Sequence, residues 1–552
     1  MSADDLAAEL LTAVLEADPL SGSLYGFAGY DSLLPDLGAA AELEQAGKLA
    51  AVAERSESLP ESGLDEGEHQ TLDFVRFMSR NMAGAARVPL IEFTICDTFV
   101  DPVASVLTML PKLALDTEER RQGYLARLTG LPQLLQTASA RHREGTAAGR
   151  TAVARLVESA VAQLDHLMAD PALGAVTRSE NDDPGFVAAA RTAVDDLVRP
   201  ALRSYQEALR SEILPQARDD AHPGICFLPD GEAMYAALAR LHASTDHSPD
   251  VLHTIGREIV EQVGQELIET GSRIWGSTDP ADIFHRLTND PALRYENRDE
   301  MLEHARRVVT EAEAEAPEWF AVVPEVPCAV EPVPEAEEAG MAAAYYMPGA
   351  IDGSRQGTYY LNTSKPTERH RYAAEDIAFH EAVPGHHFQL TVAMESTDLA
   401  PARRVLYDTA CGEGWGLYAE RLADEMGLYS DDVARMGLFA ADSWRASRLV
   451  VDTGLHALGW SRQEAVDWLA AHTPMPRMEV ESEVDRYISF PGQALAYMVG
   501  RREIVRLREM AAGRLGTAFD LKQFHDHVLR AGILPLAALA RAVERWVDRA
   551  TS

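Results

Sequence analysis

The segment His380-Glu381-Ala382-Val383-Pro384-Gly385-His386-His387 constrains the local fold more than any other part of this chain. A histidine followed by a glutamate and, one helical turn later, by a second histidine is typical of hydrolytic zinc sites, where the glutamate accepts a proton from water. Here Pro384 occupies the position of that second histidine. A regular helix is therefore excluded, because proline lacks the N–H and its ring crowds the carbonyl group of His380.

Two histidines follow the proline, and on an unbroken helix neither reaches the position that a shared metal ion requires. His387 would lie two turns, or ~10 Å, along the axis, and His386 would point about 120° away from His380. A break at Pro384-Gly385 would bring His386 to roughly the missing fourth position, because glycine tolerates backbone angles that other residues resist. We therefore predict His380 and His386 as ligands of one zinc ion and Glu381 as the general base, with His387 open as the alternative second ligand.

A third ligand is expected in the segment 408–420, which carries Glu413 and Glu420 seven residues apart on one helical face. Three glycines at alternate positions of this segment should destabilise a helix by ~3 kcal/mol relative to alanine. Such a cost indicates that the backbone lies very close to another element, and the helix of His380 is the candidate. We predict Glu413 as the third ligand. Glu420 is either a support that holds a ligand histidine through its far nitrogen or an ordinary surface carboxylate.

The segment 486–497 offers polar groups on both sides of a second Pro-Gly break. Hydrolysis of an amide requires a donor for the oxyanion, and we predict Tyr487 in this role. Arg486 is predicted to clamp a carboxylate of the substrate, since its planar fork suits that group; the alternative is that it pairs with a nearby acid. Further candidates for supporting or substrate contacts are His387, Gln389, Tyr360, Gln493 and Tyr497.

Helical periodicity dominates the rest of the chain. Apolar residues recur at spacings of three and four after Ser248-Pro249, where serine is a suitable N-cap and proline a suitable first helical residue. Asn297 with Glu300 predicts the start of another helix. We therefore predict a mainly α protein.

Two aromatic-rich runs, at 343–347 and 357–362, flank a loop that contains Asp352-Gly353. They predict a small β-hairpin or sheet near 340–363. The edge of this sheet could hold an extended substrate, or the sheet could only cap the helical core. We expect one catalytic unit over residues 1–552, with a helical lobe at 1–320 and a metal-site lobe with the small sheet at 321–552.

Composition excludes several classes of protein. The formal net charge of −37 disfavours nucleic acid as a partner, and it indicates either a preference for cationic substrates or simply an acidic surface. No apolar run of 18 residues is present, so no membrane span is expected. The N-terminus lacks the pattern of a signal peptide, and four widely separated cysteines are typical of free thiols (Cys96, Cys226, Cys328 and Cys411). We therefore expect a cytoplasmic protein.

Taken together, these residues resemble a bacterial family known as domain of unknown function 885. The resemblance rests on HEAVPGHHFQ (380–389), EGWGLYAE (413–420), RYISFPGQALAYMVG (486–500), DGSRQGTYYLNT (352–363) and FHDHVLRAGILPL (524–536). That family is similar to glutamate-zincin peptidases, in which a two-lobed, mostly helical shell encloses a deep channel. The resemblance implies such a shell here, and it favours His386 over His387 as the ligand. Gly416 stands where the family pattern has alanine, a difference that we expect to matter little.

The expected function is a hydrolase with one Zn²⁺ ion that cleaves amide bonds of short peptides or N-acylated amino compounds. One alternative is a non-zinc metalloenzyme of another reaction class with the same ligands. The other is a catalytically degenerate scaffold that binds metal or peptide, which the intact Glu381 disfavours. The motifs of serine hydrolases, P-loop proteins and dinucleotide-binding proteins are absent from the sequence. The sequence does not predict the oligomeric state.

Overall fold

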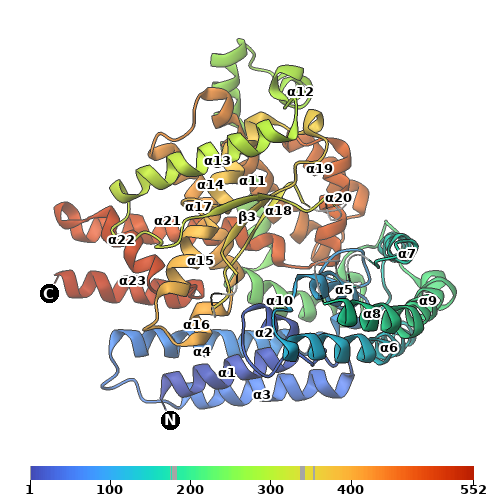
Figure 1. The fold of residues 1–552 in the computed structure, drawn as a ribbon. Helices are drawn as coiled ribbons and strands as arrows, with labels where there is room; N and C mark the ends of the chain where they lie inside the picture. Colours follow the sequence, from blue (N-terminus) through green and yellow to red (C-terminus); the bar gives the residue numbers. More distant parts are fainter. Residues whose placement is uncertain are drawn as a thin grey trace.

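The computed structural model describes residues 2–173, 176, 183–335, 338, 342–351, 353 and 355–551. These residues are mostly helical and include a single three-stranded sheet (Figure 1). The predicted class, mainly α with a small sheet, is confirmed. In the part of the chain that is described, helices that combine the length and the apolarity needed to cross a bilayer are absent.

The two ends of the chain meet in one layer of helices. Helices α1 (Ala3–Ala17), α3 (Ala39–Glu57) and α4 (Glu66–Ala85) pack together, and the short α2 (Pro19–Leu24), which follows α1 in the chain, contacts α1. The last helix, α23 (Leu536–Thr551), lies against α4 (Figure 1). Arg541 and Arg545 of α23 both pair with Asp73 of α4, at 3.1 and 3.2 Å, which ties the C-terminus to the N-terminal layer.

A second group of helices has a hydrophobic core of its own. It comprises α5 (Pro102–Met109), α6 (Glu118–Ala147), α7 (Ala154–Ala169), α8 (Pro184–Ala193) and α9 (Arg199–Ala208), and it lies to one side of the molecule (Figure 1). Leu128, Val157 and Leu202 are fully buried at its centre.

Two long helix pairs form the middle of the molecule. Helix α11 (Pro249–Trp275) packs along α18 (Asp432–His456), and α17 (Thr409–Glu425) packs along α21 (Ala496–Leu515). The predicted helix start at Ser248 is confirmed, because its side chain accepts a hydrogen bond from the Val251 amide. Around these pairs lie α10 (Gly231–Ala243), α12 (Pro280–Asn289), α13 (Arg298–Glu315), α14 (Ala374–Glu381), α15 (His386–Glu395), α16 (Pro401–Val405), α19 (Arg462–His472), α20 (Arg477–Ser489) and α22 (Leu521–Leu529).

The sheet has the strand order β1-β3-β2, with β1 (Ala329–Pro332), β2 (Ala344–Met347) and β3 (Thr358–Leu361). Strands β2 and β3 are the predicted antiparallel pair, with Tyr345 opposite Tyr360. Strand β1, which the sequence analysis did not predict, joins β3 in parallel. Asp352, predicted in the loop between the two aromatic runs, lies outside the described residues. Strand β2 is left as an edge of the sheet.

The hydrophobic cores do not divide at residue 320. The largest core runs from Leu6 to Val547 and includes side chains from both of the lobes expected from the sequence. Helices of the first expected lobe pack directly on helices of the second, as α11 does on α18 and α13 on α14. The metal-site motifs are therefore held by elements from the whole length of the chain.

Candidate metal centre

The predicted break in the histidine motif is present. Helix α14 ends at Glu381 and helix α15 begins at His386, so residues 382–385 connect two separate helices. The connection passes close to the end of α14: a Cβ atom on Gly385 would lie 1.9 Å from the carbonyl oxygen of His380. Glycine is required at this position because any side chain would overlap the preceding helix.

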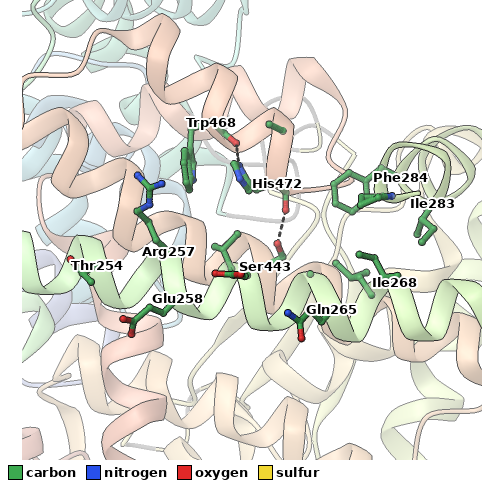
Figure 2. A pocket seen from close by; sticks show the side chains of 16 residues that line it. Thr254, Arg257, Glu258, Gln265, Ile268, Ile283, Phe284, Ser443, Trp468 and His472 are labelled. Atoms are coloured by element: carbon green, nitrogen blue, oxygen red, sulfur yellow. Dashed lines mark hydrogen bonds between the residues drawn. The ribbon is translucent and has the colours of Figure 1, made fainter. Parts of the chain in front are cut away.

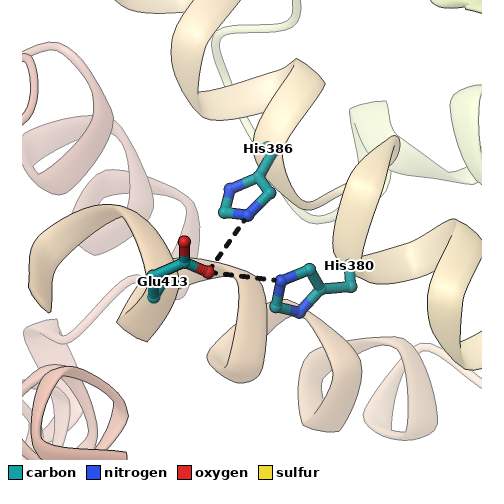
Figure 3. Close-up of side chains that lie close together, drawn as sticks. All are labelled: His380, His386 and Glu413. Carbon is teal, nitrogen blue, oxygen red and sulfur yellow. Dashed lines mark ion pairs between the residues drawn. The ribbon is translucent and has the colours of Figure 1, made fainter. Parts of the chain in front are cut away.

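The break brings His380, His386 and Glu413 together (Figure 3). The Oε2 atom of Glu413 lies 3.6 Å from Nε2 of His380 and 3.4 Å from Nε2 of His386. Ligands bound tetrahedrally at 2.0–2.2 Å are separated by about 3.4 Å, so these donor atoms have the spacing that zinc requires. In the part of the chain that the structure describes, this is the only group of three or more side chains that fits a metal ion.

Helix α17 surrounds the imidazole of His380. Glu413 faces its Nε2, and Glu420, two turns further along the same face, places Oε1 2.7 Å from its Nδ1. Glu420 is fully buried, so it is not a surface carboxylate. Gly416 lies between the two acids, where a Cβ atom would be 2.6 Å from Cε1 of the imidazole. Our expectation that glycine in place of alanine matters little is corrected here, because the ring occupies the space of the missing methyl group.

The close backbone contact that the glycines of α17 predict is confirmed. Besides the contact of Gly416 with His380, a Cβ atom on Gly414 would lie 2.4 Å from the backbone of Gly500 in α21. A Cβ atom on Gly412 would overlap the ring of Tyr407. Each glycine therefore accommodates a different neighbour, and only one of them is the motif helix.

Burial and charge act in opposite directions on the ionisation of these groups. Burial alone raises the pKa of Glu413, but hydrogen bonds from His380 and His386 outweigh it, and the pKa falls well below its ordinary value. Burial alone lowers the pKa of His380, but Glu413 and Glu420 outweigh it and raise that pKa well above 6.5. Both shifts arise because the imidazoles and the carboxylate lie close enough to share protons, which a bound cation would replace.

Glu381 is fixed beside the cluster by the sheet. Its Oε2 accepts a 2.9 Å hydrogen bond from the backbone amide of Tyr346 in β2. The hydroxyl of Tyr346 lies 3.1 Å from Nδ1 of His387, and Nε2 of His387 lies 3.1 Å from the carbonyl oxygen of Val326. Because the carbonyl can only accept, His387 donates from Nε2 and accepts at Nδ1. Both ring nitrogens of His387 are therefore used in hydrogen bonds, one of them with Tyr346. The second imidazole of the cluster is that of His386.

The cluster opens into a cavity of about 530 Å³. Six of the predicted site residues line it: His380, Glu381, His386, Glu413, Arg486 and Tyr497. The volume is within the range of pockets for small ligands. Strand β2 contributes Ala344, Tyr345 and Tyr346 to the wall, so the sheet faces the cavity as well as the core.

Five other predicted residues are not among the lining residues. Glu420 contacts His380, and His387 contacts Tyr346; both of these partners line the cavity. Gln493 accepts a 2.9 Å hydrogen bond from Arg486, and Tyr360 stacks on Tyr345 with ring centroids 5.2 Å apart. Gln389, considered for supporting or substrate contacts, donates to Sγ of Cys411 at 3.7 Å.

Tyr487, the predicted oxyanion donor, is fully buried outside the cavity lining. Its hydroxyl accepts hydrogen bonds from Nε1 of Trp444 at 2.8 Å and from Nε of Arg448 at 2.9 Å. Tyr497, by contrast, lines the cavity, and its ring stacks on that of His380 at 6.3 Å between centroids.

The sequence analysis missed the contribution of α18. Trp444, Arg445 and Arg448 of this helix line the cavity, together with Arg404, Tyr407 and Glu483 from other elements. A signal was present, because Arg445 and Arg448 stand one turn apart in a helix whose neighbouring residues are small or apolar. Charged groups on such a helix are rarely buried without a partner.

A second cavity, of about 750 Å³, lies between α11, α12, α18 and α19 (Figure 2). Its histidine, His472, is occupied by local contacts: Nδ1 lies 2.7 Å from the carbonyl oxygen of Trp468, and the carbonyl of His472 accepts from Ser443. The cavity is larger than the first, but its polar groups do not converge.

Residues 19–543 match the family model described as "Bacterial protein of unknown function (DUF885)". The chain therefore belongs to this family. It is similar over its whole length to a solved structure described as "putative lipoprotein from Colwellia psychrerythraea", with 26% identity, 100% of both chains covered and a TM-score of 0.91.

A second solved structure, a "putative lipoprotein of unknown function from Shewanella oneidensis", has 18% identity and a TM-score of 0.76 over 98% of this chain and 99% of its own. It shows that the fold is shared. No curated protein matches this chain. The hydrolase activity, the zinc ion and the cytoplasmic location stay predictions.

Proposed function

We propose that this chain is a zinc-dependent hydrolase, related to glutamate-zincin peptidases, that cleaves amide bonds of short peptides or N-acylated amino compounds. The zinc ion would be held by His380, His386 and Glu413. The observation that supports this proposal is the convergence of two imidazole nitrogens and one ionised carboxylate in the cavity that Glu381 also lines. Two imidazoles and one carboxylate leave a fourth position open, as catalytic zinc sites require.

When bound, zinc supplies Lewis acidity that activates water and polarises the carbonyl group of the substrate. The proton transfers fall to Glu381. Its Oε2 is held by the Tyr346 amide, so Oε1 is the atom that accepts a proton from the attacking water and then donates it to the departing amine nitrogen. A carboxylate fixed at one oxygen keeps the other in a constant position during both transfers.

Tyr497 replaces Tyr487 as our candidate for the oxyanion donor. The hydroxyl of Tyr487 is already engaged by Trp444, Arg448 and Glu483. Tyr497 lines the cavity and its ring stacks on that of His380, so its hydroxyl is our candidate for a hydrogen bond to the substrate oxygen on which negative charge develops.

The position of the edge strand β2 is an argument for a peptide-like substrate. Ala344, Tyr345 and Tyr346 of this strand line the cavity; the Tyr346 amide is used by Glu381, so a substrate would bond to the other main-chain groups of the edge. An extended substrate can add to such an edge through main-chain hydrogen bonds. A cavity of about 530 Å³ limits the substrate to a few residues and excludes folded proteins.

The proposal is tested by elemental analysis of the purified protein, followed by assays with dipeptides and N-acyl amino acids. We expect one zinc ion per chain and hydrolysis that is lost on chelation and restored by zinc. Iron or manganese at full occupancy, with no restoration by zinc, would favour the other class of metalloenzyme. A zinc-loaded protein that cleaves none of these compounds would favour the binding scaffold.

A further inference from the structure

The cavity beside the metal cluster is cationic, although the whole chain carries a formal charge of −37. Four arginines line it: Arg404, Arg445, Arg448 and Arg486. Apart from Glu381 and Glu413, which belong to the proposed chemistry, Glu483 is the only carboxylate among the lining residues. The acidity of the protein therefore belongs to its surface, and the cavity favours an anionic ligand.

Glu483 is shared by two of these arginines. It lies 3.1 Å from Nη2 of Arg448 and 3.1 Å from Nη2 of Arg486. Their combined positive charge, dominant over the burial that opposes ionisation, holds the pKa of Glu483 at about 2. Arg486, which the sequence suggested as a carboxylate clamp, also donates to Gln493 and is therefore occupied by residues of its own segment.

Arg445 has no such partner. Its guanidinium stacks on Trp444, with Cζ 3.8 Å from the ring centroid, and forms neither a hydrogen bond nor an ion pair with the residues that the structure describes. Asp376 is close enough to interact with its charge, but its carboxylate forms its hydrogen bond with Tyr429, and neither a hydrogen bond nor an ion pair joins it to Arg445 among the described residues. An arginine that is partly withdrawn from water without an anion is costly unless a ligand supplies one.

Arg448, one turn further along α18, has one free donor. The residue is only 3% exposed, and its Nη1 atom is buried with no hydrogen-bond partner among the described residues. Arg445 and Arg448 both pack on the ring of Tyr497, at 5.7 and 4.3 Å from its centroid. Because Tyr497 in turn stacks on His380, one aromatic ring separates the arginine pair from the metal cluster.

We propose that Arg445 and Arg448 bind a free carboxylate of the substrate, so that the preferred substrates are short peptides or N-acyl amino acids cleaved next to a C-terminal residue. The planar fork of a guanidinium matches a carboxylate in two parallel hydrogen bonds. This inference rests on the proposed function for the position of the cleaved bond. The carboxylate site itself depends only on the two arginines.

Binding is measured in zinc-loaded Glu381→Gln protein, in which substrates are expected to bind without turnover. The probes are N-acetyl dipeptides ending in Ala, Phe, Glu or Lys, each as the free acid and as the C-terminal amide, titrated by calorimetry. Loss of one partner of a hydrogen-bonded charge pair corresponds to a change of about 30-fold or more in affinity. We expect at least one acid to bind more tightly than its amide by such a factor.

Arg445→Met, added to this protein, should abolish the preference for the acid, and Arg445→Lys should retain part of it. Arg257→Met is the matched control, because Arg257 also stacks on a tryptophan, Trp468, but lines the second cavity. Zinc content and the unfolding temperature of each variant show whether it is folded. Equal affinity for acids and amides across the panel, or a preference that survives Arg445→Met, would overturn the inference.

The proposed hydrolase activity and the proposed carboxylate site can be rejected independently of each other. If the wild-type protein hydrolyses nothing but the preference for acids depends on Arg445, the carboxylate site stands and the proposed hydrolase does not. If the wild-type protein hydrolyses acids and amides with equal kcat/KM, the hydrolase stands and the carboxylate site is rejected.

Discussion

Two cavities of this protein contain similar side chains and differ in what those side chains are free to do. Each is lined by a histidine and by an arginine that stacks on a tryptophan. The first has His386 and Arg445, and the second has His472 and Arg257. In the second, the larger, His472 is bonded to its own helix and stacks on Trp468 at 4.0 Å. In the first, imidazole nitrogens face a shared carboxylate.

Volume and composition alone therefore do not identify a functional site in this protein. Polar atoms indicate a functional site when they converge and still lack partners within the protein. Burial of such atoms is unfavourable in free energy unless a ligand binds them. In the first cavity, two imidazole nitrogens and a carboxylate converge at the spacing of a metal ion, and the arginine pair has donors without a partner among the described residues.

The largest effect is expected for Glu381→Gln. Loss of the proton acceptor should lower kcat by about 10²–10⁴-fold, while zinc content remains at one ion per chain. Glu258→Gln in the second cavity is the control and should leave kcat unchanged. Turnover by Glu381→Gln at the wild-type rate would refute the role of Glu381.

His386→Ala removes a proposed ligand and should weaken zinc binding by more than about 100-fold. Loss of a residue that only hydrogen-bonds to a ligand typically weakens binding by about 10–100-fold. His472→Ala removes the histidine of the second cavity and should leave zinc affinity intact, although it loses packing on Trp468. Competition with a chromophoric chelator measures both affinities. Equal zinc affinities of the two variants would mean that His386 is not a ligand.

Glu420→Gln should lower zinc affinity by about 10–100-fold, because Glu420 orients His380 and increases its basicity through Nδ1. Glu425→Gln is a matched control on the same helix, since Glu425 is 45% exposed and pairs with Arg508 at the surface. The same titration distinguishes them. Unchanged affinity in Glu420→Gln would show that its contact with His380 does not act on the metal.

The smallest effect is expected for Gly416→Ala. The new methyl group must displace the His380 ring, which should destabilise the protein by about 1–3 kcal/mol and weaken zinc binding. Gly264→Ala in α11 meets nothing within 4 Å, so the ordinary gain of about 0.5–1 kcal/mol for alanine in a helix should appear there. Urea unfolding measures both, and a gain in stability at residue 416 would show that the ring is not confined.

The core of the site was predictable because its determinants are local. Pro384 and Gly385 require a break between the histidines, and such a break was predicted to bring His386 near His380, with His387 as the open alternative. The spacing of Glu413 and Glu420 places both acids on one helical face, and the glycines between them indicate close contact. Each of these inferences needs only the geometry of a short segment.

The rest of the site depends on packing between distant segments. Tyr487 and Tyr497 lie on opposite sides of a Pro-Gly break, and the sequence does not fix which of them turns toward the metal cluster. Arg445 reaches the cavity only because α18 packs between α11 and α14. Strand β1 was missed because Pro327 precedes it and Pro332 is its last residue, and proline is tolerated there because β1 is an edge strand.

Anomalous diffraction at the zinc edge from crystals of the zinc-loaded protein locates the metal ion without assumptions about its ligands. We expect one strong peak, within about 2.0–2.2 Å of Nε2 of His380, Nε2 of His386 and a carboxylate oxygen of Glu413. A fully occupied zinc ion bound elsewhere, with these three side chains uncoordinated, would contradict it.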